Sequence, residues 1–152
     1  MQVAALIANL SSVKRATYKK SRAQASFKRT PCAVACVLDL LGDKWTLLVV
    51  RDLLWLDKHH YNEFLQTGEN IPTNILADRL KRLEGAGIIT KEAYQQNPVR
   101  YAYRLTPKGT ALQPILKEIV TWGLRHLPYA CMREDVLRRL RIEGAGKAVQ
   151  KL

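Results

Sequence analysis

The sequence predicts a mainly helical α+β fold, and three observations support this fold class. Apolar residues recur at helical spacing through most of the central chain. Two short segments of alternating residues, separated by a turn at residues 95–98, interrupt the helical pattern and predict a β-hairpin. The length of 152 residues suffices for one hydrophobic core but not for two. We therefore expect one folded domain at residues 29–128, between a disordered basic arm (1–28) and a basic, partly helical tail (129–152).

The net charge of +12 is concentrated at the two ends of the chain. Residues 1–30 contain seven Lys and Arg and no acid, and residues 133–152 contain six basic and three acidic residues. The centre, residues 31–132, is nearly balanced, with twelve basic and ten acidic residues. This distribution favours a folded core with polyanion-binding arms over a uniformly basic protein. The first arm also has the composition of an organellar transit peptide, although a disordered arm is the simpler interpretation.

Two further features indicate a cytoplasmic protein that does not enter a membrane. No apolar run reaches the ~18–20 residues of a membrane span. The three cysteines come without an export signal, which favours free thiols in a reducing compartment over a disulfide framework.

The first three helices are predicted from apolar spacing and end signals. Thr30 and Pro31 are suited to the N-cap and first position of a helix that ends near Gly42. A second helix at residues 43–56 is almost wholly apolar and should be the most buried. A short third helix is expected in the segment YNEFLQ, residues 61–66. The apolar stripe of the first helix consists of Val34, Val37, Leu38 and Leu41.

The segment IPTNILADRLKRLEGAGIITK, residues 71–91, predicts a helix that leads directly into the hairpin. Gly87 is placed to end this helix as its left-handed residue. Strands are expected in GIITKEAY and VRYAYRLT, on either side of the turn QQNP. Thr106 and Pro107 repeat the cap arrangement and start a long helix to about Leu127, bent at Pro114. On a helical wheel Leu76, Leu80 and Leu83 cluster on one side of the 71–86 helix, opposite Asn74, Ala77, Asp78, Lys81 and Gly85.

The order helix, turn, helix, hairpin is that of a winged helix-turn-helix, which places the second helix in the major groove of DNA. Asn74 has the donor and acceptor pair that matches adenine there. Thr73 suits a phosphate or a thymine methyl group, and Lys81 and Arg82 suit phosphate oxygens. Asp78 would accept a hydrogen bond from cytosine or orient a neighbouring arginine. The competing interpretation is an ordinary solvated amphipathic helix. The glycine and the hairpin that follow the helix favour DNA binding over this interpretation.

Further DNA contacts are expected around this helix. Gln96, Asn97 and Arg100 lie at the tip of the hairpin, where a wing meets a flanking groove or the backbone. His60 begins the third helix and should face a phosphate. Arg79 lies nearer the apolar side of its helix, so a structural ion pair is as good an expectation for it as a phosphate contact.

The chain resembles HxlR-type bacterial transcription regulators over about residues 31–128. The resemblance lies in LDLLGDKW, in the RL-x-x-LE-x-x-GI pattern and in P-x-R-x-x-Y-x-LT-x-x-G, all in colinear order. It implies a winged-helix homodimer, paired through its first and last helices, that binds a palindromic operator in double-stranded DNA. Pro31 precedes Cys32 here, whereas many relatives have a proline directly after that cysteine, and the resemblance does not extend to the two ends.

The long helix that follows the hairpin carries the expected dimer interface. An apolar stripe of this length can serve both the core and a partner, and a monomer would leave much of it exposed to water. The stripe consists of Leu112, Ile115, Leu116, Ile119 and Trp122.

Cys32 aligns with the cysteine near the start of many HxlR-type proteins, some of which sense oxidants, quinones or aldehydes. At the second position of a helix, its thiolate would face unpaired backbone N–H groups. Cys36 lies one turn later and could act as a resolving thiol if the helix distorts. The alternative is that both are small buried core residues. The effector, whether a small molecule or an oxidant, is not identified by the sequence.

Neither an enzyme nor a metal protein is expected. The sequence contains no phosphate-binding Gly loop, no nucleophile motif and no carboxylate–histidine group at catalytic spacing. His59 and His60 are adjacent and so point in different directions, and we expect neither a metal nor another cofactor. The alternative to an operator-specific regulator is a general nucleic-acid-binding protein driven by its basic arms.

Overall fold

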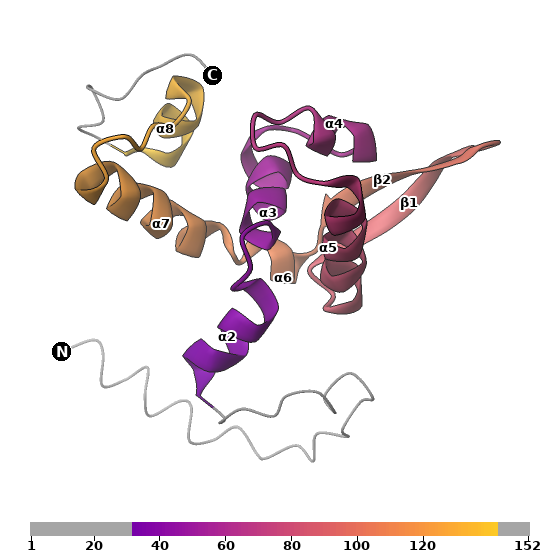
Figure 1. Cartoon of the computed structure of the whole chain (residues 1–152), viewed down its shortest axis with the longest axis horizontal. Coiled ribbons are helices and arrows are strands. Elements are labelled where there is room, and N and C mark those ends of the chain that lie inside the picture. The colour runs from indigo at the N-terminus through magenta and orange to yellow at the C-terminus, as the bar shows by residue number, and fades with distance from the viewer. Residues whose placement is uncertain (1–31, 143–152) are drawn as a thin grey trace. The chain divides into compact units, whose positions relative to one another are not determined.

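A computed structural model of the chain describes residues 32–142. It confirms the predicted mainly helical α+β fold, with one two-stranded antiparallel sheet (Figure 1). The chain divides after Leu40, so that α2 lies in the first part except for its last residue, and all later elements lie in the second. The elements are α2 (Ala33–Leu41), α3 (Thr46–Trp55), α4 (Tyr61–Leu65), α5 (Thr73–Gly85), β1 (Ile89–Gln96), β2 (Val99–Leu105), α6 (Pro107–Thr110), α7 (Gln113–His126) and α8 (Glu134–Leu140).

The core of the second part forms where α3, α5 and the sheet meet. Six of the ten residues of α3 are buried, which confirms the expectation from its apolar sequence. The predicted inner stripe of α5, Leu76, Leu80 and Leu83, is at most 2% exposed. Burial of a leucine contributes about 2 kcal/mol to folding, so this stripe holds α5 firmly on its scaffold. The opposite face of α5 is therefore exposed to solvent.

The join between α5 and the hairpin is a Schellman turn. Gly87 has φ +68°, the left-handed conformation predicted for it. The backbone N–H of Ile88 donates to the carbonyl of Leu83 at 2.9 Å, and that of Gly87 donates to Glu84 at 2.9 Å. Ile88 and Ile89 are buried immediately after the turn. The helix therefore passes into β1 without an intervening loop.

The start of α6 holds this turn from the other side. Thr106 caps α6 as predicted, because its side chain accepts a hydrogen bond from the N–H of Gly109 at 3.1 Å. The same hydroxyl donates to the carbonyl of Gly87 at 2.7 Å, and the Lys108 ammonium donates to the carbonyl of Ala86 at 2.7 Å. These contacts explain why Thr, a basic residue and Gly follow β2 in this order.

We expect Gly109→Ala to destabilise the protein by at least about 2 kcal/mol. A Cβ atom at this position would overlap the carbonyl oxygen of Ile88 and lie 2.8 Å from the Leu105 side chain. That oxygen also accepts a hydrogen bond from the N–H of Thr106 at 3.0 Å, so its displacement would disturb this contact. Urea unfolding of both proteins measures the effect. Gly85→Ala is the matched control, because a Cβ at Gly85 meets nothing within 4 Å. Equal stabilities of Gly109→Ala and wild type would contradict the close contact.

Two sequence expectations about helix ends are wrong. The expected single long helix from Thr106 is two helices, α6 and α7. Pro114 lies in the first turn of α7, where a proline is tolerated. It therefore marks the start of a helix and not a bend within one. Cys32 directly precedes α2 rather than occupying its second position. The proposed caps Thr30 and Pro31 lie outside the described residues.

The last described element is a short helix in the tail, in which two acidic and two basic residues balance in charge. α8 spans Glu134–Leu140, and its apolar residues Val136, Leu137 and Leu140 are buried. The Arg139 guanidinium donates to the carbonyl of Trp55 at 3.4 Å, which links α8 to the end of α3. Within residues 32–142, every helix is too short or too polar to cross a bilayer.

Candidate nucleic-acid interface

The outer face of α5 presents all five side chains that the sequence assigns to base and phosphate contacts. Thr73, Asn74, Asp78, Lys81 and Arg82 are exposed, whereas the leucines of the same helix are buried. At about 100° per residue, Asn74, Asp78 and Lys81 share the side of α5 opposite the leucines, and Thr73 and Arg82 lie at its two edges. Small or uncharged neighbours, Ala77 and Gly85, are also exposed on this helix, so bulky side chains do not block close approach.

The side chain of Arg79 serves the scaffold rather than this surface. Its guanidinium lies 3.3 Å from Asp43 and 3.6 Å from Asp78, and the side chain is only 15% exposed. Asp43 also caps the start of α3 by accepting hydrogen bonds from the N–H groups of Trp45 and Thr46 at 2.9 and 3.1 Å. Partial burial opposes ionisation of Asp43, but the hydrogen bond from the Thr46 hydroxyl, the two from the backbone N–H groups and the Arg79 charge hold its pKa below the ordinary value. One carboxylate thus ties α5 to the start of α3.

A second ion-pair group fixes the turn that precedes α5. Arg51 of α3 lies 2.7 Å from Asp52 and 2.9 Å from Glu69, which lies in that turn. Burial raises the pKa of Asp52, and the adjacent Arg51 charge opposes that rise. Asp52 is 4% exposed, so Arg51 compensates a buried charge within α3. The Glu69 side chain is 41% exposed, so its contact with Arg51 is a weaker, solvent-screened link to the turn.

The start of α4 is organised by a capping box between His60 and Glu63. The Glu63 carboxylate accepts hydrogen bonds from the backbone N–H groups of His60 at 2.8 Å and His59 at 2.7 Å. The His60 ring nitrogen Nδ1 lies 3.1 Å from the same carboxylate. The hydrogen bond from the His60 backbone is the main reason that the pKa of Glu63 falls to about 2.

We expect the Glu63 capping contribution to disappear in acid. A carboxylate whose pKa is lower in the folded state stabilises the fold above its unfolded value, near 4.5, and loses this effect as the pH falls toward about 2. Glu63→Gln should therefore be less stable than wild type at pH 6, and the difference should shrink at pH 3. The side chain is 41% exposed, so solvent screening limits the effect to below about 1 kcal/mol.

Urea unfolding at the two pH values measures this difference. Glu118→Gln, an exposed change on α7, is the control and should alter stability at neither pH. An equal loss for Glu63→Gln at pH 6 and pH 3 would show that the charge of Glu63 is not what stabilises the cap.

The β1–β2 hairpin, called the wing below, projects beyond α5 (Figure 1). Gln96, Asn97 and Arg100, the predicted wing contacts, are exposed at its tip, next to a register shift between Ala93 and Gln95. At its base, the Lys91 ammonium lies 3.0 Å from Glu84 of α5. The base of the wing is thus tied to the end of α5, while its tip is free to meet a flanking groove.

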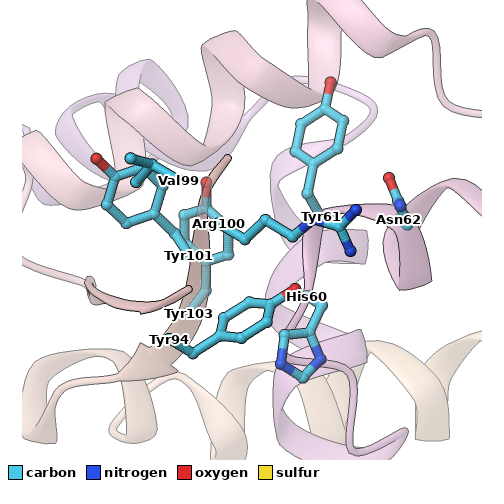
Figure 2. A pocket seen from close by; sticks show the side chains of 8 residues that line it. All are labelled: His60, Tyr61, Asn62, Tyr94, Val99, Arg100, Tyr101 and Tyr103. Carbon is cyan, nitrogen blue, oxygen red and sulfur yellow. The ribbon is translucent and has the colours of Figure 1, made fainter. Parts of the chain in front are cut away.

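A cavity of about 430 Å³ lies between the start of α4 and the wing (Figure 2). His60 and Arg100, two of the predicted DNA contacts, take part in its wall. The other lining residues were not anticipated from the sequence, although the tyrosines of the two strands were a visible signal. They are Tyr61, Asn62, Tyr94, Val99, Tyr101 and Tyr103.

The predicted dimer stripe on α7 separates into a buried and an exposed part. Leu116 is 5% exposed and belongs to the core, and Leu112 is half-buried. Ile115, Ile119 and Trp122 are 46%, 48% and 59% exposed. Their spacing of four and three residues places them on one face of the helix. Separately, α2 exposes an apolar face of its own, formed by Val34, Val37 and Leu38.

The cysteines are free thiols. Cys32 and Cys36 are exposed, which disagrees with the alternative that both are buried core residues, and Cys131 is half-buried. The backbone N–H of Cys36 donates to the carbonyl of Cys32 at 3.0 Å, so Cys32 occupies the cap position of α2. Among residues 32–142, no three His, Cys, Asp or Glu side chains gather as a metal site would require.

Comparison with known proteins places this arrangement in context. The family model described as HxlR-like helix-turn-helix matches residues 40–130. The uncharacterised HTH-type transcriptional regulator YybR of Bacillus subtilis is 32% identical over 120 residues, which are 79% of this chain and 90% of YybR. The redox regulator HypR in its oxidised form has a TM-score of 0.56 at 32% identity, covering 62% of this chain and 97% of HypR. The reduced transcriptional regulator YodB of B. subtilis has a TM-score of 0.53 at 31% identity, covering 65% of this chain and 96% of YodB.

Proposed function

Because the chain belongs to the HxlR-like helix-turn-helix family, whose similar members are transcriptional regulators, we propose that it binds a specific palindromic operator as a homodimer. The observation that carries this proposal is the exposed face of α5. Five side chains with base- and phosphate-binding chemistry stand outward there, on a helix that three buried leucines hold in place. Such a helix is suited to the major groove.

Each side chain of this face has a role that follows from its chemistry. Asn74 offers a donor and an acceptor to one adenine edge, and Thr73 contacts a phosphate or a thymine methyl group. Lys81 and Arg82 contact phosphates. Asp78 accepts from cytosine or, since it lies 3.6 Å from Arg79, orients that arginine. His60 and the wing residues Gln96, Asn97 and Arg100 add backbone or flanking-groove contacts.

The proposed homodimer is supported by the apolar side chains that the single chain leaves exposed. Ile115, Ile119 and Trp122 form one face of α7, and the face of α2 is a second candidate. Large apolar groups gathered on one surface are typical of protein–protein interfaces. A two-fold dimer would place two α5 helices about 34–36 Å apart, one turn of DNA, which matches a palindromic site.

We also propose that thiol chemistry at Cys32 controls DNA binding. HypR and YodB, two structural relatives, are a redox regulator and a regulator solved in reduced and diamide-treated forms. Cys32 and Cys36 are exposed and so accessible to oxidants or electrophiles. Exposure is the first requirement for a reactive sensor cysteine.

The test is selection of bound DNA from a random pool by the purified full-length protein, at physiological salt, with and without diamide. A palindromic consensus is the expected result. Its loss with diamide, its recovery with thiol and its persistence in oxidised Cys32→Ser would support the redox switch. Cys131→Ser is the matched control and should behave as wild type.

Two other outcomes would change the proposal. Retained DNA without any consensus would overturn the operator-specific function and favour a general nucleic-acid-binding protein. In that case removal of residues 1–28 should abolish most of the affinity, because the basic arm would supply it. A consensus that diamide leaves unchanged would keep the regulator and remove Cys32 as its sensor.

A further inference from the structure

We propose that the cavity between α4 and the wing is a binding site for a small aromatic carboxylate, and that this ligand acts as an effector of DNA binding. The cavity of about 430 Å³ falls within the ~300–1,000 Å³ of small-molecule sites. Such sites combine an apolar, aromatic wall with a few polar groups that fix the orientation of the ligand. The residues around this cavity have that combination.

The wall is made mainly of aromatic rings, contributed by both α4 and the wing (Figure 2). Tyr61 comes from α4, and Tyr94, Tyr101 and Tyr103 come from the two strands. Flat rings favour a flat ligand, because stacked and edge-to-face contacts between rings are both attractive. The expected ligand is therefore aromatic.

The rings are held in place by neighbours before any ligand arrives. His60 meets Tyr94 edge to face, with ring centres 4.7 Å apart. Tyr103 packs against the buried Phe64 at 6.3 Å, and the Lys91 ammonium lies 5.1 Å from the ring centre of Tyr101. A wall that is already ordered loses less conformational entropy on binding, which favours affinity for a small ligand.

The charge of the cavity favours an anion. Within residues 32–142, the Arg100 guanidinium has no hydrogen-bond or ion-pair partner, and the described lining residues include no carboxylate. Figure 2 shows Arg100 extending across the cavity toward Tyr61 and His60. A guanidinium binds a carboxylate through two parallel hydrogen bonds. Partial burial raises the pKa of Tyr103, so its hydroxyl remains a donor at neutral pH.

A phosphate of the DNA backbone is the competing occupant. It would satisfy Arg100, but it has no ring and so would gain nothing from stacked or edge-to-face contact with the tyrosines of the wall. The aromatic wall therefore favours a ligand with a ring over an inorganic anion or a backbone phosphate.

The cavity is directly connected to α5. The Tyr61 hydroxyl donates a hydrogen bond of 2.7 Å to the carbonyl of Thr73, the first residue of α5. Arg100 is also a proposed DNA contact of the wing. A carboxylate that pairs with Arg100 would therefore make its positive charge unavailable to DNA. The ligand should therefore weaken operator binding, and DNA should weaken ligand binding by the same factor. This regulatory step rests on the proposed function, whereas ligand binding itself does not.

Isothermal titration calorimetry on the full-length protein without DNA tests the site, with 2-naphthoate and its uncharged analogue 2-naphthalenemethanol as probes. We expect 2-naphthoate to bind with a submillimolar dissociation constant, about tenfold or more tighter than the alcohol. Arg100→Gln should weaken only 2-naphthoate, by about tenfold or more, because the ring contacts remain. Arg104→Gln, a change at an exposed arginine of β2 that does not line the cavity, is the matched control and should leave both affinities unchanged.

Two further variants test the aromatic wall. Tyr94→Ala should weaken both probes by about fivefold or more, because one ring is lost. Val99→Trp, at an exposed position on the rim, should fill the cavity and abolish both binding events. Circular dichroism and thermal unfolding establish that each variant is folded, and either variant alone suffices if the other does not fold.

Three results would overturn the proposal. One is the absence of saturable binding of 2-naphthoate up to about 10 mM. Another is unchanged binding in both Arg100→Gln and Val99→Trp, which would place the site elsewhere. The third is displacement of 2-naphthoate by an equal concentration of inorganic phosphate, which would indicate a backbone-phosphate site. Loss of DNA sequence preference in the ligand-free protein would contradict only the proposed function, because the calorimetry contains no DNA.

Discussion

Replacement of Asn74 by alanine is expected to weaken the discrimination between operator and random DNA sharply. Asn74 is exposed near the start of α5, and its amide is the group best suited to a bidentate contact with adenine. Loss of one such contact costs about 1–3 kcal/mol, and both half-sites of a dimer lose it, so the expected total is roughly 2–6 kcal/mol. Fluorescence anisotropy with the selected operator and with a scrambled duplex measures both affinities.

Comparison of the affinities for the operator and for the scrambled duplex distinguishes a base contact from a phosphate contact. Asn74→Ala should weaken operator binding strongly and leave binding to the scrambled duplex nearly unchanged, because non-specific binding depends on phosphates. Lys81→Ala should weaken both and reduce the salt dependence of binding. Gln113→Ala, an exposed amide change on α7, is the control for truncation as such. Equal weakening of both duplexes by Asn74→Ala would contradict a base-reading role.

A glutamate in place of Ile119 is expected to dissociate the proposed homodimer. Ile119 is 48% exposed at the centre of the apolar face of α7, between Ile115 and Trp122. Burial of a charge there is costly, and two-fold symmetry places two such charges in one interface. We expect the dimer dissociation constant to rise about 100-fold or more, which corresponds to about 2.8 kcal/mol. Sedimentation equilibrium of wild type and variant measures this constant.

Operator binding should fall together with the dimer. Gln113→Glu introduces the same charge at an exposed position on the opposite side of α7 and should leave the protein dimeric. A dimeric Ile119→Glu protein would show that the apolar face of α7 is not the interface. The unfolding free energy of Ile119→Glu, measured per chain, separates dissociation from misfolding.

The elements that the sequence predicts well are those determined by contacts close in the chain. Leu76, Leu80 and Leu83 recur at helical spacing, and Gly87 is the residue that a left-handed helix end favours, so α5 and its end follow from local rules. The cap at Thr106 is local in the same sense. The strands follow from alternation together with the turn between them.

The elements that could not be predicted depend on residues distant in the sequence. Asp43 and Arg79 are 36 residues apart, and only the fold shows that they meet. The sequence alone therefore left Arg79 between a structural ion pair and a phosphate contact. The cavity combines residues 60–62 with residues of both strands, so it has no continuous motif. The division of α6 from α7 depends on whether Pro114 falls in a first turn or in a helix interior, and both satisfy the same apolar spacing.

A single turn at Gly87 joins α5 to the wing, so the distance between these two elements is fixed. Three successive carbonyl groups, those of Ala86, Gly87 and Ile88, accept hydrogen bonds from Lys108 and Thr106, so the start of α6 holds the join in place. In the proposed complex, α5 and the wing would therefore contact each half-site at a fixed separation from one another. An operator with one base pair inserted between the parts that α5 and the wing contact would match only one of these elements at a time. A protein with a flexible linker between the two elements would tolerate the insertion.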